Sequence, residues 1–600
     1  MRSRTLGPGV TESLPSQVHH GYPKLAICVT VALLFTISCA GQTSTPAGNQ
    51  ASGGSPTSGG SPTRGGTITF MTFTNVSTFN PVMPPESTNN QVGQLVNRGL
   101  SQFDDQGSVV PVLAEKVPDP ADGDVSADLL TVTWKIREGV KWSDGTPLTS
   151  DDIKFTWEVC GTPANGCAKA EGMADIASID TPDARTAVLH YKQPFFNYKT
   201  QFRWGILPRH SPDVGAPADI AKWKYNQTDN PNLGPFSVAS FTSGQGAKLV
   251  RNPNFYLASE GKPYLDGINI VMRDNQETMR QAIMNGEATI SPWLTQPAPA
   301  AVQELVQKGF TVGSGSSPYN NRIQLNLFDP KDPTRTKPHP ILGDVKVREA
   351  ILRGINVDNV IYNWDIPGVY QAKQDPNRFS PYGPAFQACG IQPVPYDLAT
   401  SQSLLDSAGW KLGSDGYRYK NGQKMTLRVG TYTGYGQEDN VVVIISELKK
   451  LGIEGIADPI DVTVFYSSFS EKSPVYTGDF DILYWDIPVG EYGDAQGDVT
   501  SFYESSMIPS ASNALGHNMN GIQDTQVDAW ITQAAASLDP KVRAGLDCQI
   551  LERVDQQLWA ERWDGYIPNF QMSSPKLKGW TDAEKYVVFG SDSENWYLEP

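Results

Sequence analysis

The chain has 600 residues, a formal net charge of -16, 39% hydrophobic residues and 19% charged residues. It is too long for a single hydrophobic core, so we expect two or three lobes with soluble, globular composition. The acidic balance argues against nucleic-acid binding, which needs basic surfaces that displace counterions, and is typical of a solvated surface.

The beginning of the chain predicts export and lipid attachment. Residues 25–38 form an uncharged apolar run that follows three basic residues, as in a secretory signal. The run is shorter than the roughly 20 residues that a membrane-spanning helix needs. Residues 36–39, Thr-Ile-Ser-Cys, are similar to a bacterial lipobox, so we expect residues 1–38 to be a signal peptide and Cys39 to be lipidated. Ordinary signal cleavage nearby and an uncleaved anchor are the alternatives.

The segment behind Cys39 predicts a tether. Residues 40–66 hold almost no large apolar side chain and contain the repeat GGSPTSGGSPT. Such a composition cannot bury enough surface to fold. We therefore expect residues 39–64 to be a flexible Gly/Ser/Pro tether between the membrane and a folded body.

The stretch WKIREGVKWSDGTPLTSDDIKFTWE, residues 134–158, predicts a strand, a sharp turn and a capped helix. Apolar and polar residues alternate over 132–136, which is the pattern of a half-buried strand. Asp144-Gly145 is a turn signal, because Asp can hydrogen-bond its own backbone and Gly accepts positive φ. Residues 149–152, Thr-Ser-Asp-Asp, are typical of a helix start with acids near its positive end.

Four cysteines follow the predicted signal and its Cys39, and an even number in an exported protein favours disulfides. Cys160 and Cys167 bracket GTPANG, a loop rich in turn formers, so we predict a local disulfide between them. Cys389 and Cys548 would pair by elimination only, and the sequence leaves that pairing open. Zinc is the rival interpretation, but without a C-x-x-C pair or a nearby His we predict no metal site.

The remaining patterns indicate structure rather than catalysis. Apolar residues recur at helical spacing in 347–361, 396–410, 527–538 and 550–558, as in helices that face a core. The sequence contains no G-x-S-x-G, H-E-x-x-H, P-loop or G-x-G-x-x-G motif. The four histidines after the signal are scattered without ligand spacing. We therefore predict neither an enzyme nor a cofactor.

The order of motifs resembles that of a known family. GGTITF at residue 65 is followed by GLSQFDDQGSVVPVLAEKV, KWSDGTPLTSDD, GPFSVASF, LVRNPNFY, VREAILRGINVDNVI and YDLATSQSLLDSAGW. This order is similar to the extracellular solute-binding proteins of oligopeptide and dipeptide transporters, called family five or cluster C. The resemblance implies an α/β fold that is periplasmic-binding-protein-like, type II, cluster C, with two hinged binding lobes and an accessory lobe. The implied boundaries are 65–100, 205–320 and 565–600 for lobe I, 101–204 for accessory lobe II, and 321–564 for lobe III.

The resemblance also implies a function. We expect the extracytoplasmic substrate-binding subunit of an ABC importer, which captures peptides by hinge closure and delivers them to permease subunits. Uptake of oligosaccharides or another small solute is the alternative. We expect a monomer held at the membrane by its lipid anchor, either in the periplasm or on the outer face of the cytoplasmic membrane. An exported hydrolase or an adhesin is a third possibility, which the missing catalytic motifs and the long resemblance oppose.

The expected ligand anchor follows a tryptophan in the second binding lobe. In peptide-binding relatives a carboxylate just after this Trp takes the α-amino group of the ligand. Trp485 matches the Trp, while Asp486, Glu491 and Asp494 all lie near the expected acid, because the spacing departs from W-x-x-D. The choice among the three acids stays open, and a solvated surface turn is the alternative for each.

Other residues are expected to line the same ligand site. Some follow a predicted strand, and the others are aromatic side chains that could equally belong to a core. These candidates are Thr74, Asn75, Trp293, Tyr319, Asn320 and Tyr492.

Overall fold

The computed structural model describes residues 62–72, 75–83, 87–104, 108–170, 172–227, 230–273, 275–293, 298–375, 389–434, 436–488, 495–514, 516–581 and 589–600. The predicted signal peptide, Cys39 and nearly all of the predicted tether lie outside these ranges. Within them, no helix has the length and apolar character needed to cross a membrane.

A mixed sheet of ten strands is the largest element of the fold. Its strands come from widely separated parts of the chain, and parallel and antiparallel neighbours both occur. In spatial order they are β16 (Glu454–Ile460), β15 (Thr426–Tyr432), β17 (Ile482–Pro488), β11 (Thr311–Leu325), β18 (Glu561–Ser573), β10 (Ile290–Trp293), β1 (Thr67–Thr72), β9 (Gly267–Met272), β8 (Gly246–Arg251) and β7 (Phe236–Thr242).

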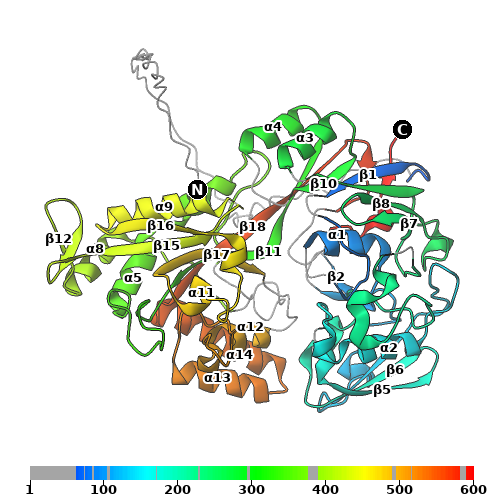
Figure 1. Ribbon diagram of the computed structural model, residues 1–600, viewed down its shortest axis with the longest axis horizontal. Coiled ribbons are helices and arrows are strands. Elements are labelled where there is room, and N and C mark those ends of the chain that lie inside the picture. Colours follow the sequence, from blue (N-terminus) through cyan, green and yellow to red (C-terminus); the bar gives the residue numbers. More distant parts are fainter. Residues whose placement is uncertain are drawn as a thin grey trace, which may run out of the picture. The chain divides into compact units, whose positions relative to one another are not determined.

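Two long antiparallel strands, β11 and β18, join the two halves of this sheet (Figure 1). The part of β18 at 570–573 pairs with β10, whereas the part of β11 at 319–325 pairs with β17. The register between β11 and β18 shifts between Ser316 and Asn320, which lies between these two pairings. A ribbon of two strands with an irregular centre can bend there, because few backbone groups have to change.

The half of the sheet that contains β17 is covered on both faces. Side chains alternate along β17, so Tyr484 packs in one apolar core and Trp485 in another. The core around Tyr484 includes residues from helices α5 (Val345–Gly354), α6 (Val357–Ile361), α8 (Leu398–Ser407) and α9 (Gln437–Lys450). The core around Trp485 includes residues from α10 (Val462–Phe465), α11 (Pro474–Thr477), α12 (Ala495–Tyr503), α13 (Thr525–Ala536) and α14 (Pro540–Glu552).

The other half of the sheet packs against α1 (Ser87–Val96), α3 (Gln276–Met284) and α4 (Pro299–Gln307). The end of the chain belongs to this half, where β19 (Leu577–Lys578) pairs with β20 (Tyr597–Leu598). A buried ion pair between Arg98 and Glu594 fastens the C-terminal segment beside α1. The beginning and the end of the folded chain therefore share one core.

Smaller sheets complete the fold. The antiparallel sheet of β4 (Thr131–Lys135), β6 (Thr186–Tyr191) and β5 (Ile176–Asp183) packs with helix α2 (Ser150–Cys160). Hairpins are formed by β2 (Ser101–Phe103) with β3 (Val109–Pro111), and by β12 (Lys411–Leu412), β13 (Arg418–Lys420) and β14 (Gln423–Lys424).

The predicted strand, turn and helix around residue 144 are confirmed. Strand β4 is followed by a turn in which the Thr146 amide donates to Asp144 Oδ1 at 2.9 Å, and Gly145 has a φ of 92°. Helix α2 begins after Thr149, whose backbone amide donates to the Asp152 carboxylate at 2.9 Å in a capping box. His210 Nε2 lies 2.9 Å from the other carboxylate oxygen of Asp144, Oδ2. These contacts make the stretch a structural unit.

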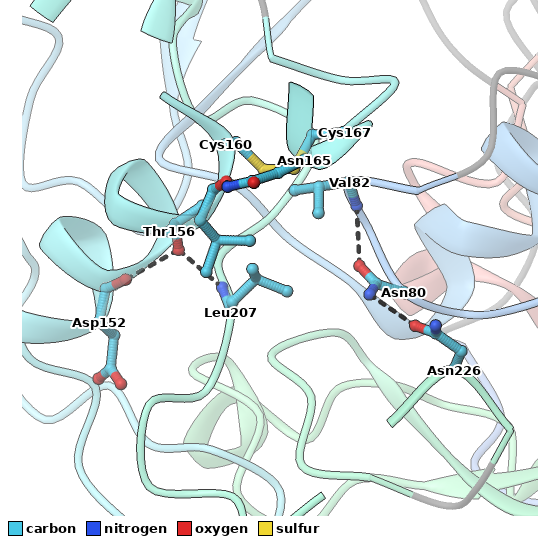
Figure 2. The surroundings of a disulfide bond; sticks show 10 residues. Asn80, Val82, Asp152, Thr156, Cys160, Asn165, Cys167, Leu207 and Asn226 are labelled. Carbon is cyan, nitrogen blue, oxygen red and sulfur yellow. Dashed lines mark hydrogen bonds between the residues drawn. A yellow bond between two sulfur atoms is a disulfide. The ribbon is translucent and has the colours of Figure 1, made fainter. Parts of the chain in front are cut away.

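A disulfide joins Cys160, the last residue of α2, to Cys167, with 5.4 Å between the Cα atoms (Figure 2). The backbone after this loop is bound to another part of the chain, because the amides of Ala168 and Lys169 donate to the Val82 carbonyl at 2.9 and 3.1 Å. Asn80 in turn accepts from the Val82 amide at 3.1 Å. The disulfide loop thus holds the segment that precedes α1.

A second disulfide joins Cys389 to Cys548 on α14, with 5.3 Å between the Cα atoms and a sequence separation of 159. It fastens a segment that follows α6 to the helices on the Trp485 side of the sheet. This bond closes a far longer stretch of chain than the first one.

Candidate functional site

A cavity of about 480 Å³, including its open mouth, lies beside the C-terminal end of β17. Strand β17 and helices α10, α11 and α12 supply most of the walls, and two loops complete them. The lining residues are Phe465, Tyr466, Val475, Tyr476, Trp485, Ile487, Phe502, His517 and Met519.

Aromatic rings form most of this lining. The ring centroid of Trp485 lies 5.5 Å from that of Phe465 and 6.4 Å from that of Tyr466. On another wall Phe502 stacks on His517 at 5.2 Å. Tyr466 remains 49% exposed, whereas Trp485 is almost buried. Tilted and stacked rings of this kind stabilise one another, so the walls are well defined.

Trp485 is fixed by a buried ion pair behind it. Arg322 on β11 and Glu561 on β18 are both fully buried and lie 3.0 Å apart. The Arg322 guanidinium lies 4.6 Å from the centroid of the Trp485 ring. The indole Nε1–H of Trp485 donates to Gln324 at 2.6 Å. The crossing strands therefore set the orientation of the ring that lines the cavity.

Asp486, the next residue on β17, does not line the cavity. The Tyr432 hydroxyl donates to its carboxylate, and Gln437 at the start of α9 donates to the same oxygen at 3.2 Å. Burial raises the pKa of Asp486. Asp486 is only 7% exposed and is not part of the cavity lining. Its carboxylate therefore binds groups in the interior of the lobe.

Two other predicted residues lie beside Trp485. Tyr319 and Asn320 on β11 are opposite Pro488 and Ile487 on β17. Asn320 is buried, and its Oδ1 accepts from the Gly565 amide at 3.2 Å, which ties β11 to β18 next to the register shift. These two residues therefore belong to the crossing ribbon.

The structure does not bring all of the remaining predicted residues to the cavity. Asn75 accepts from the Gly244 amide at 2.6 Å, so it holds the turn between β7 and β8 at the far edge of the sheet. Trp293 lies in β10, opposite Phe570 on β18. Thr74, Glu491, Tyr492 and Asp494 lie outside the described residues.

Most of the cavity lining was missed by the sequence analysis, which identified only Trp485. The aromatic pair Phe465-Tyr466 is the signal that could have been used, because it is followed directly by polar residues. Phe502, His517 and Met519 carry no such signal. In the part of the chain that the structure describes, no group of three or more His, Cys, Asp or Glu residues could hold a metal ion.

Comparison with known proteins agrees with the resemblance found in the sequence. Residues 108–509 match a family described as bacterial extracellular solute-binding proteins, family 5. The oligopeptide-binding protein AppA of Bacillus subtilis is 22% identical over 530 residues, which cover 87% of this chain and 89% of AppA.

Solved structures with the same fold bind different ligands. AppA of Bacillus subtilis in complex with a nonapeptide has a TM-score of 0.64 and 20% identity, covering 90% of this chain and 100% of its own. NikA of Brucella suis in complex with Fe(III)-EDTA has a TM-score of 0.72 and 20% identity, covering 89% of this chain and 100% of its own. These structures confirm the predicted periplasmic-binding-protein-like fold. At 20% identity, the likeness concerns the fold and not the ligand.

Proposed function

We propose that this chain, which belongs to the family 5 bacterial extracellular solute-binding proteins, captures peptides by hinge closure and delivers them to ABC permease subunits. Family 5 proteins are extracytoplasmic substrate-binding components of ABC transporters.

The crossing ribbon of β11 and β18 is the observation that carries this proposal. One part of the ribbon pairs with β10 and another with β17, so it links two bodies that have separate cores. The register shift between Ser316 and Asn320 gives the ribbon a place to bend. The aromatic cavity beside Trp485 lies next to this place and offers a surface that closure would cover.

Uptake of oligosaccharides is a second candidate, because the cavity walls are aromatic. Sugars stack on the faces of Trp and Tyr side chains, and Trp485, Tyr466 and Tyr476 line the cavity. Peptides are favoured by the relatives whose names describe peptide binding, such as AppA.

Calorimetry with a mixed peptide library and with short oligosaccharides tests this proposal. We expect the wild-type protein to release or take up heat with peptides, and Trp485→Ala to weaken binding by removing a wall of the cavity. Glu491→Gln and Asp494→Asn should weaken binding of peptides with free N-termini if either acid holds the ammonium group. Tight sugar binding without peptide binding would move the protein to the second candidate.

We also propose that Cys39 anchors the protein to the membrane by a lipid. The apolar run before it and the Gly/Ser/Pro segment behind it support this assignment. Cys39→Ser should release the protein into the medium or leave the precursor unprocessed. A variant that is processed normally and stays in the membrane fraction would contradict the anchor.

A further inference from the structure

We infer that the cavity beside Trp485 receives an uncharged aromatic or large apolar group of the ligand, and not its charged end. This inference rests on the proposed function, because it assumes that the ligand is bound at this cavity. It names the chemical class of the group that the ligand must carry.

The chemistry of the lining is the first argument. His517 apart, none of the nine residues that line the cavity has an ionisable acid or base that is charged near neutral pH. An ammonium or carboxylate group buried there would lose its hydration without gaining a charged partner from these residues, which costs several kcal/mol. An apolar group gains about 25 cal/mol for each Å² that it removes from water. The lining therefore favours an apolar group.

The charges behind the lining are the second argument. Arg322 lies 4.6 Å from the Trp485 centroid and 5.0 Å from the Phe502 centroid, so a positive charge already stands behind two walls. Glu561, its partner, also accepts hydrogen bonds from Tyr503 at 2.6 Å and from Trp563 at 3.0 Å. This carboxylate is fully buried and engaged, so it is not available to a cationic ligand group.

The acid nearest to Trp485 in sequence does not change this result. Asp486 is buried and already accepts hydrogen bonds from Tyr432 and Gln437. The Tyr432 ring packs against Phe465 and Tyr466 of the cavity wall, so the Asp486 carboxylate is already engaged by a residue that contacts that wall. Tyr466, which lines the cavity and is 49% exposed, is the wall residue that solvent reaches most easily. A ligand side chain that enters the cavity therefore meets Tyr466.

Three defined peptides, Ala-Phe-Ala, Ala-Ala-Ala and Ala-Lys-Ala, test the inference by calorimetry. We expect Ala-Phe-Ala to bind about 10- to 100-fold more tightly than Ala-Ala-Ala, which corresponds to burial of one Phe side chain. Tyr466→Ala should reduce this preference several-fold. Tyr362→Ala is the matched control, because Tyr362 is 68% exposed and is not in the cavity lining. It should leave the preference unchanged.

Two results would overturn the inference: binding of Ala-Lys-Ala as tight as that of Ala-Phe-Ala, or a preference for Phe that survives Tyr466→Ala. Indole, followed by NMR line broadening, separates this inference from the proposed function. If no tripeptide binds but indole binds and Tyr466→Ala abolishes its binding, the peptide assignment fails and the apolar cavity stands. If neither the tripeptides nor indole binds, the inference fails as well.

Discussion

Two buried carboxylates on β18, only three residues apart, have opposite surroundings. Glu561 forms an ion pair with Arg322 and accepts hydrogen bonds from Tyr503 and Trp563. Asp564 is equally buried, yet no described residue donates a hydrogen bond to its carboxylate. Burial raises the pKa of Asp564 to about 7. The comparison teaches that burial alone does not decide what a carboxylate does, because the groups provided by the neighbouring strands decide it.

The difference follows from the pairing of β18 with β11. Arg322 is opposite Trp563, whereas Asn321 is opposite Gly565, so Asp564 is the extra residue of a β-bulge. Trp563 and Glu561 lie on the aromatic side with Trp485. Asp564 lies near Tyr484, whose pKa is raised by burial and by this negative neighbour. One bulge therefore separates a saturated polar cluster from an unpaired acid within the crossing ribbon.

Removing the cation of the saturated cluster should have the largest effect. Arg322→Met should lower the free energy of unfolding by about 3–5 kcal/mol, because Glu561 would stay buried without its partner. Arg353→Met is the matched control, since Arg353 also pairs with an acid, Glu349, and lies 4.7 Å from the Trp559 ring, but is partly exposed. The control should change stability by about 1 kcal/mol or less. Denaturation followed by Trp fluorescence measures both, and equal effects would refute the distinction.

Removing a disulfide that holds the helices on the aromatic side should have the next largest effect. Replacing Cys389 and Cys548 by Ser should cost about 2–4 kcal/mol, because the bond spans 159 positions and restricts the unfolded chain strongly. Replacing Cys160 and Cys167, which are 7 positions apart, should cost less. Thermal unfolding of the two double variants gives the order, after mass mapping of unreduced peptides has verified both bonds in the wild type. The reverse order would contradict the loop-length argument.

Asp564→Asn should remove the pH dependence of folding stability that arises from this carboxyl group. In the unfolded chain an Asp ionises near a pKa of about 3.9, whereas folded Asp564 keeps its proton up to about pH 7. The folded state therefore binds more protons between these values, and stability should fall as pH rises from about 4 to about 7. At pH 8 the Asn variant should be more stable than the wild type by about 1–3 kcal/mol.

Urea denaturation of both proteins from pH 4 to pH 8 measures this slope. Asp439→Asn is the control, because Asp439 is exposed on α9. A wild-type slope that persists in Asp564→Asn would assign the pH dependence to another group.

The smallest effect should come from one hydrogen bond to the buried Asp486 carboxylate. Tyr432→Phe removes one of two donors to the buried Asp486 carboxylate and should lower stability by about 1 kcal/mol, because Gln437 still donates to it. Tyr419→Phe removes the same kind of bond at an exposed site, where Tyr419 donates to Asp415 at 2.9 Å. Thermal unfolding should show little change there. Similar losses in both variants would show that burial does not matter for this bond.

The sequence predicted those parts of the fold that local signals specify. The turn at Asp144-Gly145 and the helix start at Thr149 and Asp152 depend on neighbouring residues only, and the structure has both. The family motifs were sufficient for the fold class. The lobe boundaries stay predictions.

The candidate site could be predicted only in part, because its residues meet through long-range pairing. Phe465, Phe502 and His517 come from separate segments, and no spacing in the sequence connects them. The orientation of Asp486 follows from a simple rule: neighbours on a strand face opposite sides, so an acid directly after Trp485 cannot share its face. The sequence analysis predicted no strand at this stretch and therefore kept Asp486 among the candidate ligand contacts.

Closure of the two bodies joined by the crossing ribbon is the central claim, and a distance between them tests it most directly. Spin labels at Lys248→Cys on β8 and Lys449→Cys on α9, both exposed positions, report this distance in a Cys39→Ser background. With the mixed peptide library we expect the distance distribution to shift to shorter values and to narrow. Peptide binding that leaves the distribution unchanged would contradict capture by hinge closure.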